Sequence, residues 1–245
     1  MNVIILKSTL VAEVFLVGSL IVTLHLPKFR IWPPPKRMSW QYIYTWGLTL
    51  ASYTGILSLG ILDWNSFVLS HWLRFPIGIS IIFASFVLVI WAVWTLGFHA
   101  SQGLGGKFVQ QGPYRFTRNP QYVANIAMLL GFAILFNSIF ALPICIFGMI
   151  WFVLAPFTEE SWLRERFRTD YDIYMKNVPR FLSLFGKPRQ SDNLFFTNKT
   201  GYPKYFGNKP KDYKHQMQSN QYYADIAASI QKVTEEIIIS LNKDF

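Results

Sequence analysis

The chain has 245 residues, of which 52% are hydrophobic, 18% aromatic and only 15% charged. Soluble domains carry about 25% charged residues, so this composition argues against a single soluble domain. The net charge of +10 comes from short basic clusters beside apolar runs. Such clusters fit anchoring to lipid headgroups better than nucleic-acid binding. We therefore expect membrane lipids, and no nucleic acid, as partners.

Acidic residues are nearly absent from the first two thirds of the chain. The first 158 residues hold nine Lys/Arg but only two acids, Glu13 and Asp63. Apolar runs near 20 residues long cross a bilayer as helices. Five runs are predicted as membrane helices, at 3–26, 40–62, 76–98, 122–136 and 139–155. The expected fold class is an all-α, multi-pass helical bundle in a membrane, with about five transmembrane helices and a cytoplasmic cofactor pocket.

The basic residues of the short loops predict how the bundle is oriented. The first loop holds four Lys/Arg, the second holds one, the third holds three, and the turn between the last two runs holds none. By the positive-inside rule, the first and third loops and the C-terminus face the cytoplasm. The membrane would be the inner membrane in a bacterium and the endoplasmic reticulum in a eukaryote.

Two polar segments flank the last two apolar runs, which are separated only by Asn137-Ser138. One segment covers 107–122 and the other covers 158–167. Because a helical hairpin returns the chain to its starting side, both segments should meet at the cytoplasmic end of the bundle. Two arginines and two carboxylates would then share a partly dehydrated pocket.

Each polar residue also has a purely structural interpretation. Pro120 suits the first turn of the fourth helix. Glu159 and Glu160 are expected at a helix N-terminus behind a Thr158 cap, where they would complement the helix dipole. The arginines would anchor helix starts to lipid headgroups.

Taken together, the blocks GPYRFTRNPQY, an uncharged hairpin, EESWLRERF and YDIYMKNVPRFL resemble a known family. They are similar in order and spacing to the catalytic half of the isoprenylcysteine carboxyl methyltransferases and their prokaryotic relatives, which also resemble the phospholipid methyltransferases. The resemblance covers about residues 95–185. It implies an enzyme that binds S-adenosyl-L-methionine at the cytoplasmic side and admits a lipidic or prenylated substrate from the bilayer.

The resemblance places the family's Arg-His-Pro-x-Tyr block on residues 118–122 and its acidic pair on residues 159–160. Asn119 stands where the family has histidine. Asparagine donates and accepts hydrogen bonds but does not titrate near neutral pH, so we assign it to binding. The predicted cofactor-binding residues are Gln111, Gly112, Pro113, Tyr114, Arg118, Asn119, Pro120, Tyr122, Glu159 and Glu160. The predicted catalytic residues are Arg115, Glu159, Glu160 and Arg164.

The acceptor is not fixed by these residues. A carboxylate would need a second arginine to orient it, and Arg115, Arg164 and Arg180 are available. An amine would need a base such as a glutamate. We expect carboxyl O-methylation of a lipid-like or isoprenylcysteine-type substrate. The alternatives are phospholipid N-methylation, an NADPH-dependent membrane sterol or enone reductase, and a non-catalytic membrane adaptor.

The remaining expectations concern chain organisation. Three parts are predicted: N-terminal membrane helices at 1–98, a methyltransferase core at 99–186 and a polar cytoplasmic extension at 187–245. The extension should end in an amphipathic helix from about residue 221, which could bind a protein partner. The four histidines are too scattered for a metal site, so no metal is expected.

Overall fold

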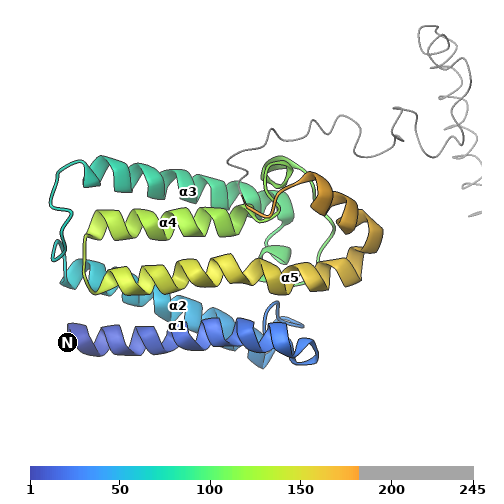
Figure 1. The fold of residues 1–245 in the computed structure, drawn as a ribbon, viewed down its shortest axis with the longest axis horizontal. Coiled ribbons are helices and arrows are strands. Elements are labelled where there is room, and N and C mark those ends of the chain that lie inside the picture. Colours follow the sequence, from blue (N-terminus) through green and yellow to red (C-terminus); the bar gives the residue numbers. More distant parts are fainter. Residues whose placement is uncertain (182–245) are drawn as a thin grey trace, which may run out of the picture. The chain divides into compact units, whose positions relative to one another are not determined.

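The computed structural model describes residues 1–181, and these are helical without any strand. Figure 1 shows the long helices running side by side between two ends of a bundle. The elements are α1 (Asn2–His25), η1 (Pro27–Phe29), α2 (Trp40–Leu62), α3 (Arg74–Leu96), η2 (Ala100–Gln102), η3 (Gly112–Arg115), α4 (Pro120–Phe136) and α5 (Ala141–Asn177). The predicted extension and its amphipathic helix lie outside the described residues.

Each predicted apolar run corresponds to a helix, and the multi-pass membrane bundle is confirmed. Four of the described helices, α1, α2, α3 and α5, are long and apolar enough to cross a membrane. The fourth in chain order, α4, is a shorter apolar helix of 17 residues. Its first residue is Pro120, as predicted, because proline's missing N–H has no partner in a first turn in any case.

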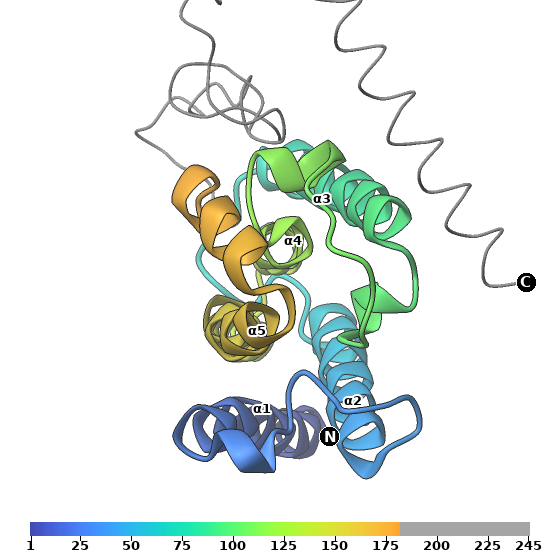
Figure 2. The same cartoon turned by 90° about the vertical axis from the view of Figure 1, so that its right-hand side faces the viewer.

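Helix α1 packs against α2, and α3 packs against α4. Helix α5 closes the bundle by contacting α1, α2 and α4. Figure 2 views this arrangement along the helices. The α3–α4 crossing depends on glycine: a Cβ added at Gly78 would lie 2.9 Å from Leu135 Cβ and 3.2 Å from the Gly131 carbonyl oxygen. Small residues therefore allow these two backbones to approach closely.

The α4–α5 turn is a tight hairpin, as predicted. Asn137 ends α4 in the left-handed conformation, and its buried side-chain amide donates to Asn65 Oδ1 at 2.8 Å and to the Phe67 carbonyl at 3.1 Å. Its Oδ1 accepts from the Leu69 N–H at 2.9 Å. The hairpin turn is thereby fastened to the α2–α3 loop. We call the end of the bundle that contains this turn the hairpin end, and we call the opposite end the loop end.

The last helix differs from the prediction. We expected a span ending near Ala155 and a new helix starting behind a Thr158 cap. Instead α5 continues through Pro156, and the Thr158 hydroxyl donates to the Ala155 carbonyl inside the helix. Residues 141–158 carry no charge and form the membrane-spanning part, whereas the part from Glu159 onward is charged. Glu159 and Glu160 therefore lie in a helix interior and do not complement a helix N-terminus.

The charged part of α5 turns back at Arg168, whose φ of 47° and ψ of −123° interrupt the helical geometry. The segment after this residue packs on the segment before it through an apolar cluster that includes Tyr171, Tyr174 and Phe108. The orange end of α5 in Figure 2 shows this reversal. The turn brings residues 171–181 over the loop that precedes α4.

Candidate functional site

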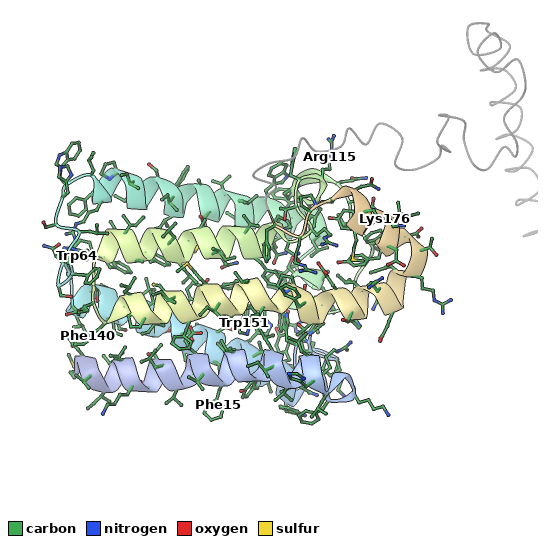
Figure 3. All side chains as sticks on the ribbon, viewed as in Figure 1. Phe15, Trp64, Arg115, Phe140, Trp151 and Lys176 are labelled. Carbon is green, nitrogen blue, oxygen red and sulfur yellow. The ribbon has the colours of Figure 1, made fainter. Side chains whose placement is uncertain are left out.

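The predicted polar segments meet at the loop end. Figure 3 shows Arg115 and Lys176 there, at the opposite end of the bundle from Trp64 and Phe140. Backbone and side-chain hydrogen bonds join the two segments directly. The Arg118 N–H donates to the Pro179 carbonyl at 2.9 Å, and the Asn119 side-chain amide donates to the Arg180 carbonyl at 3.0 Å. The residues that follow α5, 178–181, are thus held against the start of α4.

The first cavity at this end has a volume of about 120 Å³. The α3–α4 loop, the start of α4 and the charged part of α5 form its walls. Its lining combines aromatic rings with hydrogen-bonding groups, as small-molecule sites do. The aromatic residues are Phe108, Tyr114, Tyr122, Trp162, Phe167, Tyr171 and Tyr174, and the polar or charged ones are Ser101, Lys107, Arg118, Asn119, Gln121 and Glu159.

Glu159 is the only acidic residue among the described residues that line the first cavity. Its carboxylate accepts a hydrogen bond from the Tyr122 hydroxyl, which in turn accepts one from Trp32 Nε1 at 3.0 Å. Within residues 1–181 it forms no salt bridge. Burial raises the pKa of Glu159 to about 7, against the lowering effect of its hydrogen bonds. A cation entering this cavity would meet an acceptor without a competing basic partner.

A second cavity of about 680 Å³ lies on the other side of Arg118. Glu160 faces it and forms a clamp with two arginines. Arg180 donates to both carboxylate oxygens, at 2.8 and 2.6 Å, and Arg118 Nη2 lies 3.2 Å from Oε1. The two hydrogen bonds that Arg180 donates to Glu160 raise the pKa of Arg180. Adjacent residues of a helix point about 100° apart, which is why neighbouring glutamates reach different cavities.

Arg118 belongs to both cavities. Its side chain is 9% exposed, and its Nε is buried without a hydrogen-bond partner in the described structure. A buried guanidinium donor without an acceptor is costly. This N–H is therefore available to an anionic or carbonyl group of a ligand.

Some of the remaining predicted residues line one of the two cavities, and the others line neither. Tyr114, Asn119, Pro120 and Tyr122 line the first cavity, and Arg164 lines the second, where it pairs with Asp172 at 2.9 Å. Gln111, Gly112, Pro113 and Arg115 line neither cavity. The arrangement of two arginines and two acids is thus distributed over two cavities that share Arg118.

Gly112 and Arg115 have different surroundings. Gly112 has a φ of +57°, and a Cβ there would lie 2.8 Å from Thr95 Oγ1 on α3. It therefore lets η3 pack closely on α3. Arg115 is exposed.

Sequence reasoning missed several residues of the site. Trp32 comes from the α1–α2 loop, and no local pattern links that loop to Tyr122. Lys107 and Phe108 lie in a segment without periodicity. Tyr171 and Tyr174 stand in a block that we quoted for the resemblance, and their i, i+3 spacing on one helix face could have indicated a shared role.

Comparisons with known proteins agree with the motif-based resemblance. Residues 73–170 match the family model described as phospholipid methyltransferase. A curated relative, steroid 5-alpha-reductase DET2 from Solanum lycopersicum, is 31% identical over 111 residues, which is 45% of this chain. That match spans 43% of the relative, so the chain covers less than half of its length. No solved structure matches the chain. The matched family belongs to the superfamily of isoprenylcysteine carboxyl methyltransferases and phospholipid methyltransferases, and the match covers residues 73–170 of this chain.

Proposed function

We propose that the protein is an S-adenosyl-L-methionine-dependent membrane methyltransferase that acts on a lipidic acceptor. The observation that carries this proposal is Glu159, a half-buried acid without a basic partner among residues 1–181, in an aromatic cavity at the end of a membrane bundle. Such a site favours a cationic, partly aromatic ligand. The family match over residues 73–170 supports the same class of reaction.

The residues of the first cavity fit the charge pattern of S-adenosylmethionine. The cofactor carries two positive groups, a sulfonium and an ammonium, and Glu159 supplies the matching charge. It carries one carboxylate, for which the unpartnered Nε of Arg118 is a donor. Tyr114 and Tyr122 provide rings for the adenosine, and Tyr114 also provides a hydroxyl. When bound, the cofactor would supply an electrophilic methyl group.

Methyl transfer from a sulfonium is an in-line displacement, so the chain needs no nucleophilic side chain. Its residues must hold donor and acceptor about 3–3.5 Å apart and keep water out. Arg118 is suited to this task because it is held by Glu160 and faces both cavities. We assign the cofactor to the first cavity and the acceptor to the second, with Arg118 between them.

The second cavity favours an anionic acceptor that arrives from the lipid. Its charged lining consists of four basic residues, Arg118, Arg164, Lys176 and Arg180, and two acids, Glu160 and Asp172. Phe157 of α5, which is 39% exposed, adds an apolar wall to this cavity that suits an acyl or prenyl chain. These groups support carboxyl O-methylation of a lipid-like or prenylated substrate, with phospholipid N-methylation as the alternative. Arg115, which lines neither cavity, is not assigned a role.

Binding measurements on the purified, detergent-solubilised full chain test the proposal. S-adenosylhomocysteine and NADPH are titrated separately by calorimetry into wild-type protein and into the Glu159→Gln and Arg118→Ala variants. We expect S-adenosylhomocysteine to bind the wild type and to bind Arg118→Ala at least about tenfold more weakly, because a charge-assisted contact is lost. Binding of NADPH alone would refute the proposal.

Acceptor class is tested after binding is established. The protein is incubated with a labelled methyl donor and a membrane extract, and the product is treated with base. A methyl ester releases labelled methanol, whereas a methylated amine retains its label. Release of label supports the carboxyl acceptor, and retention supports the phospholipid amine.

A reductase is the second candidate, because the relative from Solanum lycopersicum is a steroid 5-alpha-reductase. The rim of the first cavity offers some support. Trp162 lines it, and the guanidinium carbons of Arg30 and Arg166 lie 5.3 and 5.5 Å from the Trp162 ring centroid. Arginines at this position suit the 2′-phosphate of NADPH. Glu159 inside the same cavity opposes a polyanionic ligand, which is why we place this candidate second.

We also propose that the loop end faces the cytoplasm. The two loops that build it, 26–39 and 97–119, hold seven Lys/Arg, whereas loop 63–73 at the other end holds none. Single cysteines at Lys36 and Ser66, in a Cys145→Ala background, can be labelled in intact cells with a membrane-impermeant maleimide. Labelling at Ser66 alone is expected, and labelling at Lys36 would show the opposite orientation.

If neither S-adenosylhomocysteine nor NADPH binds in the titrations, the non-catalytic adaptor alternative gains support.

A further inference from the structure

We propose that Trp32 is a positioning residue of the first cavity: it orients the Tyr122 hydroxyl so that Glu159 remains a hydrogen-bond acceptor for a cationic ligand. Trp32 lies in the α1–α2 loop, 4% exposed and outside the segment that matches the family. The inference rests on the proposed function for the identity of the ligand. Its local claim, that Trp32 acts on Glu159 through Tyr122, is tested separately below.

The direction of the hydrogen bonds follows from donor chemistry. Trp32 Nε1 lies 3.0 Å from the Tyr122 hydroxyl oxygen, and an indole N–H donates but never accepts. The hydroxyl oxygen therefore accepts from Trp32 and uses its single proton to donate to Glu159. A carboxylate receives such a proton, whereas a protonated carboxyl group competes as a donor. The chain Trp32–Tyr122–Glu159 thus favours the ionised acid.

The indole is held from three sides, as a positioning group requires. Trp151 of α5 packs edge-to-face on it, with ring centroids 5.5 Å apart. Thr23 Oγ1 at the end of α1 fixes the backbone that carries the indole: it accepts from the backbone N–H of Trp32 at 3.4 Å and from that of Ile31 at 3.0 Å. A Cβ added at Gly103, after η2, would lie 2.8 Å from Trp32 Cη2. The ring has little room to rotate away from Tyr122.

The other titratable groups around Glu159 do not replace this effect. They are Tyr122 on α4, Tyr114 on η3, Glu160 and Tyr171 on α5, and Lys107 and Arg118 in the loop that joins α3 to α4. Neither Lys107 nor Arg118 comes within salt-bridge distance of Glu159. Since burial already raises the pKa of Glu159 to about 7, removal of the indole donor should raise it further.

The experiment compares Trp32→Phe with Trp46→Phe in the full chain. Trp46 is a matched control because its ring packs on Trp32, with centroids 6.4 Å apart, while its Nε1 points to the Gln102 carbonyl at 3.4 Å. Protonation of Glu159 is followed by infrared difference spectroscopy of the carboxyl band, with Glu159→Gln spectra as the blank. We expect the titration midpoint to rise in Trp32→Phe and to stay unchanged in Trp46→Phe.

Ligand binding gives a second readout. S-adenosylmethionine carries a positive sulfonium, and S-adenosylhomocysteine carries a neutral thioether in its place. At pH 7, Trp32→Phe should bind S-adenosylmethionine about fivefold more weakly, the equivalent of one hydrogen bond, with S-adenosylhomocysteine affinity changed less than twofold. Equal losses for both ligands would indicate a merely structural role and overturn the proposal.

A double-variant cycle covers the case in which Trp32→Phe perturbs folding. Tyr122→Phe removes the intermediate hydroxyl with little change of volume, and in this background Trp32→Phe should no longer move the Glu159 midpoint. A full midpoint change in the Tyr122→Phe background would overturn the inference. If wild-type protein binds neither ligand, the proposed function fails, and the infrared midpoints still decide whether Trp32 acts on Glu159.

Discussion

Replacing Glu159 by glutamine should stabilise the folded protein in alkaline solution and leave it almost unchanged in acid. Burial raises the pKa of Glu159 from its ordinary value of 4.5 to about 7. A carboxyl group whose pKa is higher in the folded state binds its proton more tightly there, so stability falls as the pH rises between these two values. Glutamine keeps an acceptor for Tyr122 but carries no charge, which removes this pH dependence.

The expected magnitude follows from the two pKa values. The difference between 4.5 and about 7 corresponds to roughly 3 kcal/mol at pH 8, where the folded protein must keep the buried carboxylate ionised. At pH 5 the same cost is under about 1 kcal/mol, because the carboxyl group is largely protonated when folded. The stabilisation by Glu159→Gln should therefore grow by roughly 2 kcal/mol between pH 5 and pH 8.

The free energy of unfolding is measured by titrating mixed detergent micelles with sodium dodecyl sulfate at both pH values. Helix content is followed by circular dichroism, and Glu160→Gln serves as the neighbouring comparison. If the stability difference between Glu159→Gln and wild type is the same at pH 5 and pH 8, the pKa of Glu159 is not raised in the folded protein and the reasoning is refuted. Destabilisation by Glu159→Gln at pH 8 would refute it equally.

Three further comparisons test other parts of the structure by the same assay. Glu160→Gln should destabilise the protein by about 3 kcal/mol, because it leaves the buried Arg118 guanidinium without its carboxylate; an effect below about 0.5 kcal/mol would contradict the clamp. Asn137→Ala should cost about 1 kcal/mol more than Asn137→Gly, because the φ of 48° disfavours a Cβ; equal costs would exclude that strain. Gly131→Ala should destabilise through a Cβ 2.8 Å from a side chain of α3, whereas Gly47→Ala, with nothing within 4 Å, should stabilise α2 by up to about 1 kcal/mol. The reverse order would contradict the α3–α4 packing.

The membrane helices were predictable because their lengths are set by the bilayer. The predicted run at 40–62 agrees with α2 at both ends, and the run at 122–136 agrees with α4 at its end. The other predicted starts and ends differ from the helices by a few residues, with one exception. The exception is the C-terminal side of the last span. A change from apolar to charged residues marks the membrane surface, and this surface does not coincide with the end of α5. The predicted helix N-terminus behind Thr158 is wrong, because α5 continues through Pro156 and Thr158.

The site was predictable only in part, for a related reason. The meeting of residues 107–122 with residues 158–167 follows from the hairpin topology, and the structure contains it. The separation of Glu159 from Glu160 required knowing that both lie in a helix interior, where neighbours diverge by about 100°. The participation of Trp32 depends on how α1 packs against α5. This packing cannot be predicted from the sequence of the α1–α2 loop.

Helix α5 runs without a break from Ala141 to Glu159, so the distance of the two acids from the hairpin is set by the length of this helical segment. Glu159 lies 18 positions after Ala141 at the hairpin, which corresponds to a rise of about 27 Å along the helix. An insertion of one residue in this stretch would rotate the rest of α5 by about 100° about the helix axis, so that Glu159 and Glu160 would no longer face their cavities. A four-residue insertion would restore the facing but raise both acids by about 6 Å. The spacing between hairpin and acids is therefore under tighter constraint than the identity of the apolar residues that fill it.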